Sequence, residues 1–393
     1  MNQGHKLSLS FTGDIAFDKY MDGKWEDEKL VSDEILKFLH DSDHVIVDVE
    51  GPVSDYEDDG NQEGLSQMVH AINPKAVNVL DNLHADIWDI CNNHMMDLGE
   101  EGLLDTLYNA KKAGVTTIGA GKNIEDASNP IFFEEAGGVG MFAIGYRGIK
   151  YGCKGAGDSK AGCLTWNETK IIQDNIKKIK DKCRWCLIVC HGGEEFTTLP
   201  SPYVRDRLKS ILDMGADIIV CHHPHVPLNY ELFPGKAIFY SLGNFIFDTP
   251  YQRTQHNTDI GVLLKVHLDK DVFSFDAIGI KIMRDDTHRI VKGRLPDIFC
   301  DVDEEEYNLL SPLAAKMFIS ATKTQYTYIF PDKYKDFTEE DWVEDFMNPN
   351  RLERIEGEIL DYVIIYNLAL KAEEGNWKKS RLDKVKEYII SQL

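Results

Sequence analysis

Residues 216–225 read ADIIVCHHPH, a run of β-type residues that ends in His223 and His225. Four further runs end in the same abrupt way, each at a side chain that can bind a metal ion. They are LSLSFTGD (7–14), ending at Asp14; VIVDVE (45–50), ending at Glu50; ADIWDICNNH (85–94), ending at Asn93 and His94; and WCLIVCH (185–191), ending at His191. One polar residue after a strand is usually a cap, but five such endings in one chain indicate a shared site.

In an open α/β sheet the carboxyl ends of the strands line one crevice, where side chains from distant parts of the chain can meet. We therefore expect one small cleft to hold six of these side chains: Asp14, Glu50, Asn93, His191, His223 and His225. Carboxylate, amide and imidazole donors suit Zn, Mn or Fe. Two such ions about 3.5–4 Å apart can activate water for attack at phosphorus or a carbonyl carbon. The pattern favours a metal-dependent hydrolase.

Composition and charge narrow the class of protein. The chain has 393 residues, of which 43% are hydrophobic, and can bury a substantial core in one large domain or two ordinary ones. Its net charge of −23 repels nucleic acid, so we expect no nucleic-acid partner. The N-terminal residues MNQGHKLSLSF lack a signal-peptide apolar region, and no later stretch is apolar enough to span a membrane. We expect a soluble, cytoplasmic protein.

Short β-type runs alternate with helical ones from residue 5 to about 295, which predicts a layered α/β domain over 1–295. Apolar residues recur at helical spacing in 27–40, 74–83, 99–113, 167–181 and 201–214. Three β-rich runs between Gly235 and Met283 are expected to be adjacent antiparallel strands of a second sheet. Residues 296–393 are charged and helical in pattern, and predict a C-terminal helical extension.

Several segments carry a family resemblance. FTGD, VEGPVS, CNNHMMDLGEEGLLDTL, CHGGEEF and GADIIVCHHPHVPLNYELFPGKAIFYSLGNFIFD occur in the order found in the CapA family of poly-γ-glutamate capsule proteins, whose domain resembles the calcineurin-like metallophosphoesterases. The resemblance spans about residues 7–250. It implies a four-layer α/β/β/α sandwich of metallophosphoesterase type, with the site at one edge of the two sheets, and a link to poly-γ-glutamate synthesis.

The resemblance also implies roles for individual residues. Asp14 would hold one metal with His225, and Glu50 would bridge the two ions. The second ion would be held by Asn93, His191 and His223. His94 would act as general acid or stabilise the transition state.

Two positions depart from the phosphoesterase pattern. Asp14 is followed by Ile15 and Ala16, where that pattern has Asp-x-His, so the first metal position loses a ligand. The bridging residue is Glu50 in place of an Asp. The first position should therefore bind more weakly than the second, and the expected cofactor is one or two divalent ions or none.

Residues near the motifs extend the candidate site. Asp97 lies at a helix start, where it either caps the helix or takes part in catalysis, and Glu195 follows His191 and could orient it or act as a general base. Arg147 and Arg205 could pair with a substrate carboxylate, and Asn244 follows a tight turn beside the cleft. Strand alternation predicts that His222 points away from the site.

Three functions agree with these residues. The first is a metal-dependent hydrolase acting on an amide or ester bond of a small-molecule, γ-glutamyl or other peptide substrate. The second is a metal-independent peptide epimerase, in which paired carboxylate and imidazole groups remove and return a proton next to a carbonyl. The third is a non-catalytic protein that binds or assembles the capsule polymer. Elemental analysis of the purified protein for bound metal separates the first function from the other two. The sequence does not predict the oligomeric state.

Overall fold

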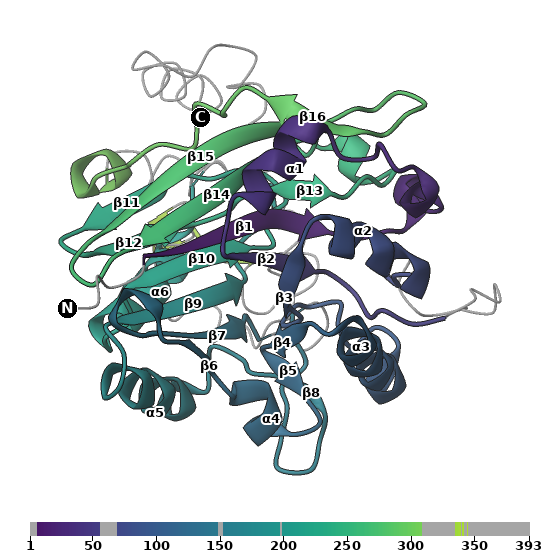
Figure 1. Cartoon of the computed structure of the whole chain (residues 1–393). Coiled ribbons are helices and arrows are strands. Elements are labelled where there is room, and N and C mark those ends of the chain that lie inside the picture. The colour runs from purple at the N-terminus through teal and green to yellow at the C-terminus, as the bar shows by residue number, and fades with distance from the viewer. Residues whose placement is uncertain are drawn as a thin grey trace.

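The structure is a computed structural model that describes residues 6–55, 69–147, 152–196 and 199–308, and a few positions between 335 and 344. Two β-sheets stack face to face and carry helices on their outer faces (Figure 1). This arrangement is the α/β/β/α sandwich that the family resemblance implies, and it agrees with the layered α/β domain that the alternating sequence pattern predicts.

The larger sheet has eight strands in the order β16-β15-β14-β1-β2-β3-β4, and β13 pairs with the end of β1. Its parallel half consists of β1 (Leu7–Ile15), β2 (His44–Val49), β3 (Ala85–Asp89) and β4 (Thr116–Ile118). Its antiparallel half consists of β14 (Ile260–Leu268), β15 (Phe273–Ile282) and β16 (Ile290–Gly293). β13 covers Asn244–Ile246. The parallel half supplies the strand ends at which Asp14, Glu50 and Asn93 lie.

The smaller sheet has six strands in the order β11-β12-β10-β9-β7-β6. They are β6 (Ile131–Phe133), β7 (Val139–Gly145), β9 (Trp185–His191), β10 (Ile218–His222), β11 (Tyr230–Phe233) and β12 (Lys236–Phe239). β5 (Ala120–Gly121) and β8 (Gly162–Cys163) form a separate short pair. The parallel strands β9 and β10 end side by side, at His191 and His222.

Alternation along each strand divides the core into layers. Val189 of β9 and Val220 of β10 belong to the cluster between the sheets, whereas their neighbours Ile188 and Ile219 pack against helices. The helices near the larger sheet are α1 (Asp33–His40), α2 (Val77–Asn82) and α3 (Gly99–Ala113). Those near the smaller sheet are α4 (Ile124–Ser128), α5 (Thr169–Lys180) and α6 (Pro202–Asp213). Four layers result (Figure 1).

The expected helices form, with shifted ends. α3 covers the predicted residues and ends at Gly114, whose φ of 75° gives the left-handed cap expected of glycine. The helix predicted over 27–40 begins only at Asp33, after Ser32, and Lys24–Glu26 form a separate 3-10 turn. The segment predicted over 74–83 is a 3-10 turn at Pro74–Ala76 followed by α2.

The prediction of a separate second sheet over Gly235–Met283 is wrong. Its first run divides into β12, which joins the six-stranded sheet, and β13, which joins the eight-stranded sheet beside β1. A turn at Gly243 (φ 70°) connects the two. The approach is so close that a Cβ on Gly13 would lie 2.0 Å from the carbonyl oxygen of Gly243. β14 and β15 are antiparallel as expected, but they extend the sheet of β1.

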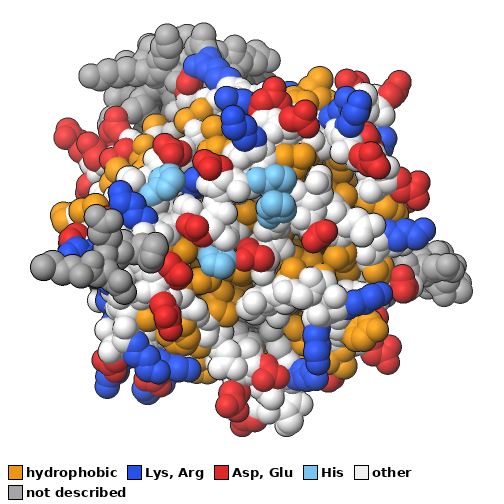
Figure 2. Space-filling view, viewed as in Figure 1, with side chains coloured by type: hydrophobic (Ala, Val, Ile, Leu, Met, Phe, Trp, Pro, Cys, Tyr) orange, Lys and Arg blue, Asp and Glu red, His pale blue; other side chains and the backbone are white. Residues whose placement is uncertain are grey.

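Most of the predicted helical extension over 296–393 lies outside the described residues. Its described beginning packs on the α/β domain, where Phe299 contacts Tyr230 and the Tyr307 ring lies 4.0 Å from the Arg205 guanidinium. Among the described residues, no helix has the length and apolarity needed to cross a bilayer. On the face shown in Figure 2, acidic and basic side chains are interspersed.

Candidate functional site

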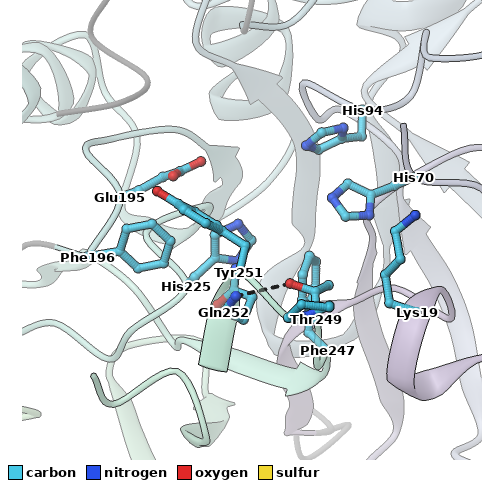
Figure 3. Close-up of a pocket in the computed structure, with 11 residues that line it drawn as sticks. Lys19, His70, His94, Glu195, Phe196, His225, Phe247, Thr249, Tyr251 and Gln252 are labelled. Carbon is cyan, nitrogen blue, oxygen red and sulfur yellow. Dashed lines mark hydrogen bonds between the residues drawn. The ribbon is translucent and has the colours of Figure 1, made fainter. Parts of the chain in front are cut away.

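The candidate site lies between the two sheets, beside a pocket of about 220 Å³ (Figure 3). The larger sheet and the loops after its strands contribute Asp14, Glu50 and Asn93. The smaller sheet and the turn after β10 contribute His191, His223 and His225. The structure brings these six side chains into one linked cluster, because each lies near at least one other member.

Glu50 lies at the centre of this cluster and is completely buried. Its Oε1 atom is 3.7 Å from His225 Nε2, 3.8 Å from His191 Nε2 and 4.0 Å from His94 Nε2. These distances are too long for hydrogen bonds. Among the described residues, neither carboxylate oxygen of Glu50 has a hydrogen-bond partner.

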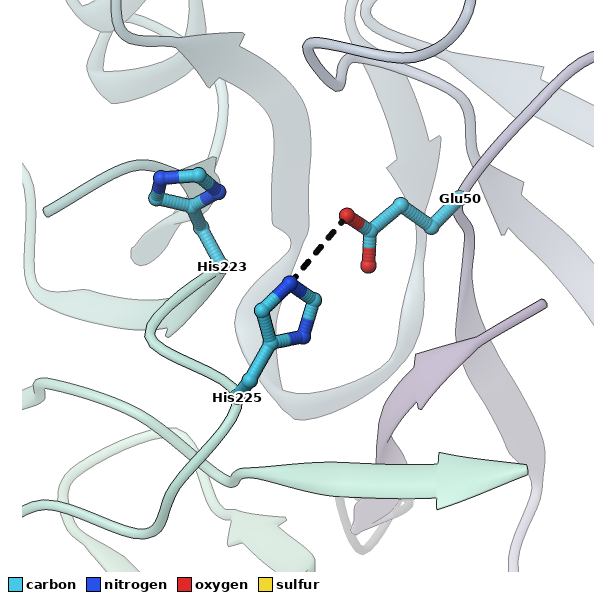
Figure 4. Close-up of side chains that lie close together, drawn as sticks. All are labelled: Glu50, His223 and His225. Carbon is cyan, nitrogen blue, oxygen red and sulfur yellow. Dashed lines mark ion pairs between the residues drawn. The ribbon is translucent and has the colours of Figure 1, made fainter. Parts of the chain in front are cut away.

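The donor set fits a divalent cation. Ligand atoms of Glu50, His223 and His225 lie within 4.8 Å of one another (Figure 4). Both ring nitrogens of the buried His223 also lack a hydrogen-bond partner among the described residues. Buried polar atoms of this kind are costly unless something binds them. An ion with carboxylate and imidazole ligands would satisfy Glu50 and His223 together.

The pKa shifts of Glu50, His191 and His223 agree with this fit. Burial, together with the nearby Asp14 and Asp48 carboxylates, raises the pKa of Glu50 well above its usual range. A bound cation would reverse that cost by favouring the carboxylate. Burial lowers the pKa of His191 and of His223 well below the usual range, so both imidazoles are neutral. Neutral imidazole is the form that binds a metal.

Two of the imidazoles are oriented through Nδ1, the nitrogen turned away from Glu50, by a carboxylate and, for His225, also by an amide. His191 Nδ1 lies 3.0 Å from Asp48 Oδ2, and its Nε2 lies 2.7 Å from Asn93 Oδ1. His225 Nδ1 lies 3.1 Å from Asp14 Oδ2 and 3.0 Å from Asn244 Oδ1, which leaves Nε2 directed to Glu50. Contacts of this type fix the tautomer and ring orientation of metal-binding histidines.

The prediction that His222 points away from the site is wrong. His222 is the register partner of His191, and its Nδ1 lies 3.1 Å from Asp14 Oδ1. Strand β10 ends at His222, and His223 then adopts a φ of 97°. The prediction assumes that His223 belongs to the strand and faces the site, so that its neighbour His222 would face the other way. In the structure the strand ends at His222, and His223 lies outside it. Instead, His222 shares the inner face of Val220, and the turn brings His223 back to the cluster.

His94 lines the pocket and is held by Asp97, since its Nδ1 lies 2.7 Å from Asp97 Oδ2. Its Nε2 is directed to Glu50. Burial, followed by the nearby His70, lowers the pKa of His94. Glu195, the other predicted catalytic carboxylate, also lines this pocket. Asp97 thus orients a pocket imidazole in addition to its place at the helix start.

The three predicted substrate-binding residues, Arg147, Arg205 and Asn244, are not among the residues that line the pocket. Arg205 is buried and makes a bidentate ion pair with Glu231, at 2.6 and 2.9 Å, so its guanidinium serves the fold. Asn244 is buried behind His225 and donates to Gln252 and Thr258, so it is a positioning residue. Arg147 is exposed and is not among the residues that line the pocket.

Sequence reasoning missed Asp48 and a second imidazole–carboxylate pair. Asp48 lies on β2, two residues before Glu50, which directly follows the strand, so alternation continued by one residue places both on one face and was a usable signal. The other pair is His70 and Asp18, whose Nδ1 and Oδ2 atoms are 2.6 Å apart across 52 positions of sequence. No local pattern connects these two residues.

Comparisons with known proteins give the family. A match to "Bacterial capsule synthesis protein PGA_cap" covers residues 8–249. The chain is 32% identical over 270 residues to the PGA biosynthesis protein CapA of Bacillus subtilis, which covers 67% of this chain and 68% of that protein. It is 31% identical over 290 residues to the capsule biosynthesis protein CapA of Bacillus anthracis, which covers 71% of this chain and 68% of that protein.

Likeness to solved structures is partial. A hypothetical protein from Thermus thermophilus aligns with a TM-score of 0.43 and 11% identity, over 70% of this chain and 99% of that one. A 5'-nucleotidase from Candida albicans aligns with a TM-score of 0.40 and 12% identity, over 70% of this chain and 51% of that one. The family match spans the strand ends and turns that carry all six clustered side chains, and the chain belongs to the bacterial capsule synthesis protein family PGA_cap, which includes CapA.

Proposed function

We propose that this protein is a metal-dependent hydrolase that cleaves an amide or ester bond of a γ-glutamyl or other peptide-like substrate, in the context of poly-γ-glutamate synthesis. The observation that carries the proposal is Glu50, a buried carboxylate with both oxygens unpartnered among the described residues and three imidazoles 3.7–4.0 Å away. The names of the Bacillus relatives support the polymer as the substrate class.

Glu50, His191, His223, His225 and Asn93 would hold the ion. A bound divalent ion supplies Lewis-acid polarisation of the scissile carbonyl and a more acidic water. Asp48 and Asp14 keep His191 and His225 in their ligand orientations.

His94 would move the proton. Asp97 can only accept a hydrogen bond when ionised, so it holds the Nδ1–H of His94 and leaves the Nε2 lone pair facing Glu50. A neutral imidazole in this position can take a proton from the attacking water and deliver it to the leaving group.

The test is hydrolysis of γ-glutamyl oligomers by protein stripped of metal and then reloaded with Zn, Mn or Fe(II). We expect activity only after reloading. Glu50→Gln should lose both metal and activity. His94→Ala should keep its metal and its fold while turnover falls by about two to four powers of ten, the usual contribution of general acid–base catalysis. Equal turnover by stripped and reloaded protein would exclude the metal-dependent reaction.

One observation favours the epimerase as a second candidate. Glu195 and His94 lie on different sides of the pocket (Figure 3), and proton removal and return on opposite faces of a carbon needs two such groups. Stripped protein incubated with a peptide in D₂O separates the two functions. Deuterium at Cα without cleavage would favour the epimerase, and neither reaction would favour a binding protein.

A further inference from the structure

We propose that His70 and Lys19 form a subsite that binds a substrate carboxylate next to the scissile bond. Both residues line the pocket that also contains His94 and His225 (Figure 3). The inference rests on the proposed function and names the chemical group that this side of the pocket recognises.

His70 is held so that one nitrogen is left for a ligand. Its Nδ1 atom lies 2.6 Å from Asp18 Oδ2, and its backbone N–H donates to Asp97 Oδ2 at 2.9 Å. The ring packs edge-on against His94, with centroids 4.1 Å apart, and against Phe247 at 5.2 Å. Against the cost of burial, the Asp18 carboxylate raises the pKa of His70 and so favours the imidazolium form, whose Nε2–H is the donor left for a ligand. An imidazole fixed on three sides loses little freedom when it binds a ligand.

Lys19 reaches the same pocket from an unusual backbone conformation. Its φ is 53°, in the left-handed region that residues other than Gly, Asn and Asp seldom adopt. Such conformations persist where the surrounding structure imposes them, and they concentrate at functional sites. The neighbouring Asp18 anchors His70, so two consecutive residues supply the anchor of the imidazole and a cation beside it.

The charge arrangement on this side of the pocket favours an anion. Asp18 and Asp97 direct their oxygens to His70 and His94, so they are not the groups offered to a ligand. Lys19 and His70 offer only N–H donors, whereas Glu195 lies on the other side, beside Phe196 (Figure 3). The volume of about 220 Å³ is below the roughly 300–1,000 Å³ of sites for drug-sized ligands. The whole pocket therefore has room for about one residue of the substrate, whose acidic group can lie on the side of Lys19 and His70.

Two matched probes test the subsite without requiring turnover. One is a γ-glutamyl tetramer with free α-carboxylates, and the other is the same tetramer with α-carboxamides. Binding of each to the metal-loaded protein is measured by titration calorimetry. We expect the carboxylate tetramer to bind at least about tenfold tighter, and the difference to fall below about threefold in Lys19→Met and in His70→Gln. Lys29→Met removes an exposed lysine outside the pocket and is the matched control, with the preference retained.

Several results would overturn the subsite. They are equal binding of the two tetramers by the unaltered protein, binding of neither, tighter binding of inorganic phosphate than of the carboxylate tetramer, or an equal loss of preference in Lys29→Met. The hydrolase is judged separately, by release of glutamate from either tetramer. A protein that prefers the carboxylate tetramer but never cleaves it would keep the subsite and refute the hydrolase.

Discussion

His191 lies between two side chains that fix its ring, Asp48 at Nδ1 and Asn93 at Nε2. We predict that Asp48→Asn weakens metal binding about 10- to 100-fold, the usual effect of removing the group that orients a ligand histidine. Competition with a chromophoric chelator measures the affinity.

Asp86→Asn is the control for Asp48→Asn, because Asp86 makes the same kind of contact to His44, at 2.5 Å, outside the candidate site. Its metal affinity should be unchanged. If the two variants lose affinity equally, the effect comes from general destabilisation and Asp48 does not orient His191.

The pair of His70 and Asp18 predicts a pH-dependent stability. Despite burial, the Asp18 carboxylate raises the pKa of His70 above 6.5, and His70 lowers the pKa of Asp18 below 3.8. The His70 contribution is complete below pH 6.5 and is lost as pH rises through the folded-state pKa. The Asp18 contribution is present above pH 3.8 and is lost in acid.

His70→Gln should therefore lower the melting temperature more at about pH 6 than at about pH 9. Thermal unfolding of both proteins at the two pH values measures the difference. An equal loss at both values would show that the pair contributes by packing alone.

Individual site residues can be predicted where a strand ends beside them. Asp14, Glu50, Asn93, His191, His223 and His225 all follow from that rule, and the structure places them together. His222 is misplaced by the same rule, because the sequence does not reveal that β10 stops one residue before His223 takes a positive φ. His70 could not be found, because only the tertiary fold brings Asp18 to it.

Arg205 lies on helix α6 and contacts the first residues of the C-terminal region, which the structure describes as far as residue 308. Its guanidinium pairs with buried Glu231 and also reaches Glu304, whose side chain is 60% exposed. We predict that Arg205→Gln lowers the free energy of unfolding by about 3–5 kcal/mol, because Glu231 would remain buried without its partner.

Glu304→Gln removes the exposed partner of the same arginine and should cost about 1 kcal/mol or less. Denaturant unfolding measures both variants, and metal content should stay unchanged in both. If Arg205→Gln is as stable as the unaltered protein yet binds γ-glutamyl oligomers less tightly, the role in substrate binding predicted from the sequence is the right one.

Helices with a strong periodicity can be predicted from the sequence. The point at which the chain crosses from one sheet to the other cannot. α3 matches its predicted bounds because its apolar face, acidic start and terminal Gly114 agree. The predicted turn before Asn244 divides the run KAIFYSLGNFIFD, but nothing in the sequence shows that the two halves join different sheets, because both halves are apolar. The path also requires the close approach of Gly13 to the Gly243 carbonyl, which a side chain at Gly13 would block.

At the scale of the whole molecule, the candidate metal ligands come from both sheets. An ion bound by Glu50 on one side and His191, His223 and His225 on the other would link the sheets in the folded state only. We predict that metal raises stability by about 2.7 kcal/mol when its free concentration is about 100 times the Kd.

Removal of metal with a chelator should lower the melting temperature accordingly, and Glu50→Gln should show no response to metal. Differential scanning calorimetry over a series of metal concentrations measures this shift. A melting temperature independent of metal in the unaltered protein would contradict binding between the sheets.

The family match ends at residue 249, whereas β14 begins at Ile260 and pairs with β1 from Leu7 to Phe11. A protein shortened to the family match would keep every candidate ligand but would uncover one edge of β1. An uncovered edge offers free N–H and C=O groups to the strands of other molecules and promotes aggregation. Shortened versions made for crystallisation should therefore extend at least to Gly293, where β16 completes the sheet.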